Sequence, residues 1–166
     1  MEFQKRDFLQ VIEANQGIIR SLCKVYYQNP EDQKDVFQDI ILQLWRSFGT
    51  FRGESRISTW IYRVSLNTIL TKVRDEKTNR VITEPIDRAE LAFSSSMADD
   101  DTELLKLVLR SLKDLDKAIV ILYLEGYKTK EISGILSITP TNVTTRLSRV
   151  KAELKIKFKD RQYELK

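Results

Sequence analysis

The sequence of 166 residues contains no histidine, and it has only one cysteine, five glycines and three prolines. Without histidine the chain lacks the commonest general base and metal ligand, and no glycine-rich phosphate loop occurs, so neither enzymatic catalysis nor a bound metal or cofactor is expected. A single cysteine, Cys23, excludes an internal disulfide and suits a reducing cytoplasm. No apolar run approaches membrane-spanning length, and the charged start lacks a secretory signal, so membrane insertion is not expected.

Charge is segregated along the chain, although the net charge is only +4. Residues 46–80 carry eight basic and three acidic residues, and residues 126–166 carry ten basic and four acidic residues. Residues 84–103, which lie between these blocks, carry seven acidic residues and one basic residue. Two basic blocks predict two surfaces that bind a polyanion, whereas either block alone would more simply be a solvated helix face.

Apolar spacing predicts an all-α fold of two small helical domains joined by a flexible acidic linker. The pattern is helical from about residue 5 to residue 76, with a break at Asn29-Pro30. The pattern fails between about residues 78 and 101, where Pro85, three serines and three aspartates are typical of a linker. The expected division is therefore a domain over 1–77, a linker over 78–101 and a second domain over 102–166.

The helix expected after Pro30 has a clear amphipathic pattern. Its apolar side chains recur at helical spacing and predict one wide buried face. These residues are Val36, Phe37, Ile40, Ile41, Leu44, Trp45 and Phe48. The opposite stripe is polar except for Leu42, which is either an ordinary exposed leucine or part of a partner-binding face.

A helix-turn-helix is predicted in the second domain. A core helix ending at Gly126 precedes a short helix over 129–136, a turn at Ser137-Ile138, and a helix that starts at Pro140 with Thr139 as its cap. The outward face of this last helix is basic and rich in hydroxyls, which favours entry into the major groove over a purely structural three-helix unit. The candidate DNA contacts are Asn142, Thr144, Thr145, Arg146, Ser148 and Arg149.

The segment 49–68 starts as a polar loop and becomes a helix at Ile57. Trp60 lies on the inner stripe of that helix and is predicted to anchor the core. The side chains expected to be available for DNA are Arg56, Tyr62, Arg63, Asn67 and Lys72. From the residues alone, Asn67 is explained equally well by plain solvent exposure and by recognition of an unstacked base.

The two blocks, in this order, resemble the extracytoplasmic-function (ECF) group of bacterial RNA polymerase sigma factors. The segment 51–68 resembles their promoter-melting segment, and Asp35-Val36-Phe37-Gln38-Asp39 resembles the segment that binds the clamp helices of the polymerase β′ subunit. The resemblance implies a cytoplasmic promoter-specificity subunit that is not an enzyme. Such a subunit binds core polymerase at the β′ clamp helices and the β flap, recognises the −35 and −10 elements of promoter DNA and promotes melting. An anti-sigma factor is a further expected partner.

The resemblance also implies roles for individual residues. The −10 element would be held by Phe51, Arg52, Ser55, Arg56, Arg63 and Asn67, and the −35 element by the helix that starts at Pro140. Core polymerase would be bound by Asp35, Gln38, Asp39 and Leu42.

Two other interpretations of the sequence belong to different functional classes. One is a stand-alone helix-turn-helix regulator, which would bind duplex DNA without core polymerase. The other is a protein-binding adaptor, which would leave the exposed Asn67 and Arg149 without a role. The stripe that contains Asp35 and Leu42 discriminates between the first of these and a sigma factor, because only a sigma factor uses it to bind polymerase.

Overall fold

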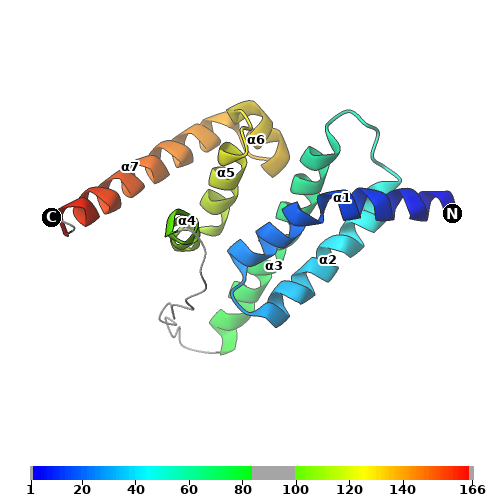
Figure 1. The fold of residues 1–166 in the computed structure, drawn as a ribbon, viewed down its shortest axis with the longest axis horizontal. Coiled ribbons are helices and arrows are strands. Elements are labelled where there is room, and N and C mark those ends of the chain that lie inside the picture. Colours follow the sequence, from blue (N-terminus) through cyan, green and yellow to red (C-terminus); the bar gives the residue numbers. More distant parts are fainter. Residues whose placement is uncertain (1, 84–99, 165–166) are drawn as a thin grey trace.

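The computed structural model describes residues 2–83 and 100–164, and within these ranges it contains seven helices and no strand. The all-α prediction is therefore confirmed. Figure 1 shows two groups of helices, with α1, α2 and α3 in the first and α4, α5, α6 and α7 in the second. Their bounds are α1 (Glu2–Tyr26), α2 (Pro30–Phe48), α3 (Ile57–Thr83), α4 (Asp100–Ser111), α5 (Asp114–Leu124), α6 (Thr129–Leu136) and α7 (Pro140–Glu164).

The boundaries of α2 and α3 follow from local chemistry. The side-chain oxygen of Asn29 accepts the backbone N–H of Glu31 at 2.9 Å, which caps α2, and Pro30 occupies its first position. After α2 the chain passes through a loop in which Gly53 has a φ of +73°, a conformation that residues with a Cβ rarely adopt. The helix predicted from Ile57 then begins at that residue.

The core of the N-terminal domain lies between α1, α2 and α3, which pack against one another. Its fully or nearly fully buried side chains include Ile19, Leu22, Cys23, Val36, Ile40, Leu44, Trp60, Ile61, Leu66 and Ile69. The predicted burial of Cys23 and Trp60 is confirmed. The predicted burial of Trp45 is wrong: this residue is 43% exposed and forms a T-shaped ring pair with Phe8, with the ring centroids 5.1 Å apart.

The helix-turn-helix in the C-terminal domain has the predicted boundaries. Ser137 ends α6 in the left-handed conformation, with a φ of +55°. The hydroxyl of Thr139 accepts the backbone N–H of Asn142 at 3.1 Å, so it caps α7 as expected. Val143, Leu147 and Val150 face inward from α7 and are buried, so the opposite face of this helix points away from the core.

The two domains contact each other directly. Helix α3 packs against α5 and α6, and α1 packs against α4. In Figure 1, α7 extends away from these contacts towards the C-terminus. Helix α3 continues to Thr83, six residues beyond residue 77, where the first domain was predicted to end, and the predicted linker from residue 84 to residue 99 lies outside the described residues.

Candidate nucleic-acid interface

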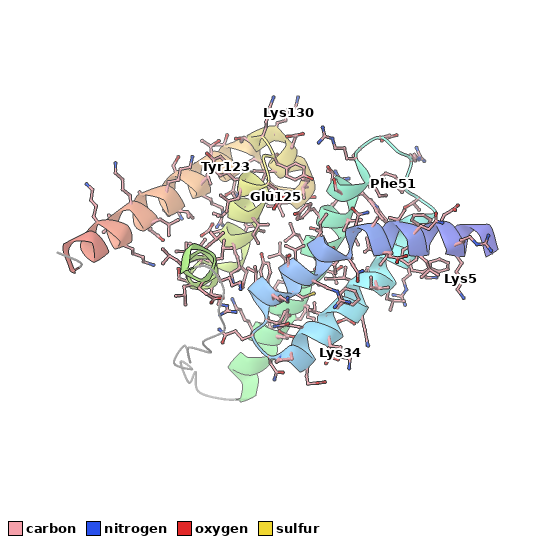
Figure 2. All side chains as sticks on the ribbon, viewed as in Figure 1. Lys5, Lys34, Phe51, Tyr123, Glu125 and Lys130 are labelled. Atoms are coloured by element: carbon pink, nitrogen blue, oxygen red, sulfur yellow. The ribbon has the colours of Figure 1, made fainter. Side chains whose placement is uncertain are left out.

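The loop before α3 presents two of the residues predicted to bind the −10 element to solvent. Arg52 and Arg56 are exposed, whereas Ser55 and Phe51 are partly buried. The Phe51 ring, labelled in Figure 2, packs on Trp60 with the ring centroids 5.3 Å apart. Phe51 therefore anchors the loop to the core.

A groove with a volume of about 760 Å³ runs between α2 and α3. From α3 it is lined by Arg63 and Asn67, which are both exposed, and from α2 by Leu42, Gln43 and Ser47. Arginine, asparagine, glutamine and serine side chains together offer donors for phosphate and base edges. The groove therefore joins the predicted −10 site to the predicted polymerase site. The sequence gives no signal that Gln43 and Ser47 line the same groove as Asn67, because only the packing of α2 on α3 places them there.

One predicted polymerase contact has a partner inside the protein. The carboxylate of Asp39 accepts a hydrogen bond from the Lys72 ammonium at 2.6 Å, across the same groove. This hydrogen bond to Asp39 raises the pKa of Lys72, against the opposing effect of partial burial. The pair neutralises two charges, so in this conformation Lys72 is not free to meet a phosphate.

A second groove, between α1 and α2, is apolar and has a volume of about 450 Å³. Leu42 lies on the ridge between the two grooves because it lines both. Leu9, Leu42 and Trp45 are 55%, 45% and 43% exposed, so the groove wall consists of large apolar side chains in contact with water. Asp35 and Gln38 are exposed on the same helix. An apolar surface of this kind, next to polar residues, is typical of a protein-binding site.

The predicted DNA contacts on the outward face of α7 fall into two groups, which differ in their exposure. Thr144, Thr145, Ser148 and Arg149 are exposed. Asn142 and Arg146 are partly buried and bonded to each other, with Arg146 Nε donating to Asn142 Oδ1 at 2.8 Å. Arg146 Nη1 also donates to the Asp116 carboxylate of α5 at 2.9 Å. These two bonds tie the guanidinium of Arg146 to its own domain.

The expectation that Tyr62 is available to DNA is wrong for this conformation. Tyr62 is only 7% exposed, and its ring forms a T-shaped pair with the ring of Tyr127, in the turn between α5 and α6. Burial, together with the nearby carboxylate of Glu125, raises the pKa of Tyr62. The sequence carries no signal for this burial, since it results from contact between the two domains.

The structure describes residues 2–83 and 100–164. Within that part of the chain, no three histidine, cysteine, aspartate or glutamate side chains lie close enough together to hold a metal ion. None of the helices described there is both long enough and apolar enough to cross a membrane.

Two family models match the chain, one on each domain. Residues 11–78 match sigma-70 region 2, and residues 102–154 match sigma-70 region 4. The first match covers the helices that carry Leu42 and Asn67, and the second covers the helix-turn-helix.

Individual relatives agree with these matches. The chain is similar to RNA polymerase sigma factor SigV of Bacillus subtilis, with 30% identity over 137 residues that cover 80% of each chain. It is also similar to ECF RNA polymerase sigma factor SigM of Mycobacterium tuberculosis, with 24% identity over 89% of this chain and 74% of the relative. Among solved structures, the sigma factor RpoE of Bartonella quintana, in complex with the anti-sigma factor NepR, has a TM-score of 0.73 and 17% identity, covering 96% and 98% of the two chains.

Proposed function

We propose roles for these surfaces on the premise that this chain belongs to the ECF family of RNA polymerase sigma factors, as the two region matches and the relatives show. It is a promoter-specificity subunit that acts in transcription initiation. One observation supports the detailed assignment best: the chain carries two separate polar surfaces whose side chains can bind phosphates and base edges. One is the groove with Arg63 and Asn67, and the other is the exposed face of α7.

We assign the −10 element to the N-terminal domain. Arg52, Arg56 and Arg63 would bind the phosphates of the opened strand, and Asn67 would pair with an extruded base, since an amide donates and accepts at once. Phe51 and Ser55 would shape the loop around that base. Unpairing and unstacking a base costs a few kcal/mol, and these contacts would offset that cost, so DNA opening requires no bond chemistry from this chain.

We assign the −35 element to α7, which would lie in the major groove as duplex-reading helices of this motif do. The exposed Thr144, Thr145 and Ser148 lie in the first half of the helix and would face base edges, while Arg149 would reach a phosphate. Asn142 and Arg146 lie on the same face. Their bonds to each other and to Asp116 support a role in orienting that face.

We assign core polymerase to α2, at Asp35, Gln38, Asp39 and Leu42, where the clamp helices of β′ would dock; the β flap would meet the C-terminal domain. The exposed Leu9 and Trp45 would extend the β′ contact into the apolar groove. Burying such side chains stabilises a complex by about 25 cal/mol per Å² of apolar surface removed from water. We further propose an anti-sigma factor as a partner, as in the RpoE structure, and a cytoplasmic location beside the polymerase.

The polymerase assignment is tested by replacing Leu42 with lysine. Leu42→Lys places a charge on the ridge between the two grooves and should abolish co-purification with core polymerase, while leaving the circular dichroism spectrum unchanged. Leu105→Lys is the matched control, because Leu105 on α4 is similarly exposed at 43%. A Leu42→Lys protein that still co-purifies with core would contradict the assignment. A protein that binds promoter duplex with full affinity without core would support a stand-alone regulator instead.

A further inference from the structure

The second helix of the helix-turn-helix extends well beyond the motif itself. Helix α7 has 25 residues, which makes it about 37 Å long. The match to sigma-70 region 4 ends at residue 154, so the last ten residues of α7, up to Glu164, lie beyond that match. In Figure 1 this end of α7 extends away from the other helices. The end is also basic, because residues 151–161 contain five basic and two acidic residues.

The lysines at this end of α7 differ in whether they have a partner within the protein. The Lys151 ammonium lies 4.4 Å from the centroid of the Tyr123 ring and 3.2 Å from the Tyr123 hydroxyl. Lys155, Lys157 and Lys159 are exposed, and within the part of the chain that the structure describes they form no hydrogen bond or ion pair. Their ammonium groups are therefore available to an external anion.

Two of these lysines share a face of α7 with residues assigned to base edges. At 3.6 residues per turn, positions i, i+4, i+11 and i+15 fall on one stripe of a helix. The residues at these positions are Thr144, Ser148, Lys155 and Lys159, and all four are exposed. The stripe therefore carries hydroxyls in the first half of α7 and ammonium groups in the second half.

Lys157 lies on a different side of the same helix. It is two positions from both Lys155 and Lys159, which corresponds to roughly 160° round the helix axis. It follows Val150 and Leu154 at helical spacing, and those two side chains pack on the core of the domain. Lys157 therefore carries an equal charge on the same exposed end of α7, but away from the stripe.

The dimensions of DNA place the end of the stripe at phosphates. The major groove is about 12 Å wide, so its phosphate edges lie roughly 6 Å from its middle. Along α7, Ser148 is about 10 Å from Lys155 and about 16 Å from Lys159. When Ser148 faces base edges, the two lysines lie at or beyond the edge of the groove. The groups within their reach there are phosphates and not bases.

We propose that Lys155 and Lys159 bind backbone phosphates of the duplex beside the −35 element. This inference rests on the proposed function of α7, and it adds a contact that is independent of sequence to the base contacts of the first half. DNA suits the stripe better than a protein partner does. Ile156 is 64% exposed beside the two lysines, but a single apolar side chain does not form the contiguous patch that is typical of a protein-binding site.

The proposal is tested by titrating the whole chain with duplex DNA at several salt concentrations. The double variant Lys155→Gln/Lys159→Gln removes two charges and keeps a good helix former at each position. It should lower the slope of log affinity against log salt concentration by about 1.8, because each lost phosphate contact contributes about 0.9. From about 50 to about 200 mM salt, the affinity of the wild-type chain should therefore fall about 12-fold more than that of the double variant.

Lys157→Gln is the matched control, because it removes the same charge from the same end of α7 on another side. It should leave the slope unchanged. An unchanged slope in the double variant would overturn the proposal. A decrease in Lys157→Gln as large as half of that in the double variant would also overturn it, because the net charge of the helix would then explain both results.

A second readout distinguishes a phosphate contact from a base contact. Phosphates carry no sequence information, so the double variant should lose the same factor of affinity on a duplex with the −35 element and on a duplex of unrelated sequence. A change in the ratio of the two affinities would overturn the proposal. Loss of co-purification with core polymerase, at an unchanged slope, would overturn it in favour of a protein partner.

The failure of this inference can be told apart from the failure of the proposed function. If Arg149→Ala lowers the slope and the double variant does not, α7 binds DNA and the inference about its last turns is wrong. If the double variant lowers the slope but the wild-type chain prefers no duplex sequence, the proposed reading of the −35 element fails and the phosphate contact stands.

Discussion

The ion pair between Arg146 and Asp116 should contribute to the stability of the C-terminal domain. The Asp116 side chain is 11% exposed and that of Arg146 is 29% exposed, so the pair lies between a surface ion pair and a fully buried one. Breaking a buried pair from one side costs about 3–5 kcal/mol, and an exposed pair contributes about 0–1 kcal/mol. Arg146→Ala should therefore lower the free energy of unfolding by about 2 kcal/mol, because it leaves the Asp116 carboxylate without its partner.

A double-mutant cycle separates this effect from DNA recognition. Arg146→Ala, Asp116→Ala and the double variant should give a coupling energy of about 1–2 kcal/mol. Asn142→Ala should cost less, about 1 kcal/mol, because it removes one neutral acceptor. Amide hydrogen exchange of α5 and α7 is the suitable assay, since Trp45 and Trp60 both report on the other domain. This reasoning would be refuted by a coupling energy near zero between Arg146 and Asp116, together with a loss of duplex affinity in Arg146→Ala as large as that in Arg149→Ala. That result would show that Arg146 faces DNA.

Three other predictions concern DNA binding and the buried thiol. Asn67→Ala should reduce open-complex formation about 10-fold and duplex affinity less than twofold, because the Asn67 amide meets only an extruded base. Equal losses of open-complex formation and of duplex affinity, both measured by footprinting, would contradict the base-pocket role. Arg149→Ala should lower the slope of log affinity against log salt concentration by about one, as for one lost phosphate contact, and an unchanged slope in a titration would argue against it. Burial raises the pKa of Cys23 from 9.0 to about 11, so iodoacetamide at pH 8 should label it at least about 100-fold more slowly than in urea. Comparable labelling rates would show that the thiol is open to solvent.

Local chemistry explains why much of the fold could be predicted. Asn29-Pro30 marks the start of α2 because the two residues supply a cap and a fixed φ, and both effects act within one turn. The helix-turn-helix is equally local: Thr139 and Pro140 specify the start of α7 through a hydroxyl bond and a missing N–H. Such features need no knowledge of the partner helices.

The errors concern contacts between distant parts of the chain. Trp45 has the spacing of a core residue, but α1 covers it only in part, so it forms a wall of the apolar groove. Tyr62 has the spacing of an exposed residue, and a tyrosine 65 positions later in the chain covers it. Periodicity reports which side of a helix is apolar and does not report how far a neighbouring helix or domain extends over that side.

The position of Arg146 illustrates the same limit within a single helix. It lies on the outward face of α7 with the other predicted DNA contacts, and its side chain is long enough to reach either DNA or α5. The choice is made by Asp116, 30 positions earlier, which the packing of α5 against α7 brings within hydrogen-bond distance. Only the structure reveals that partner.

Transcription in vitro with purified core polymerase and a library of promoter sequences tests the account most directly. The wild-type chain should direct core enzyme to initiate RNA at defined positions, downstream of a shared pair of sequence elements near −35 and −10. Leu42→Lys should lose this activity, and Leu105→Lys should retain it. If the wild-type chain bound duplex DNA but directed no core enzyme to a defined start, the assignment of its two domains to promoter opening and promoter reading would be contradicted.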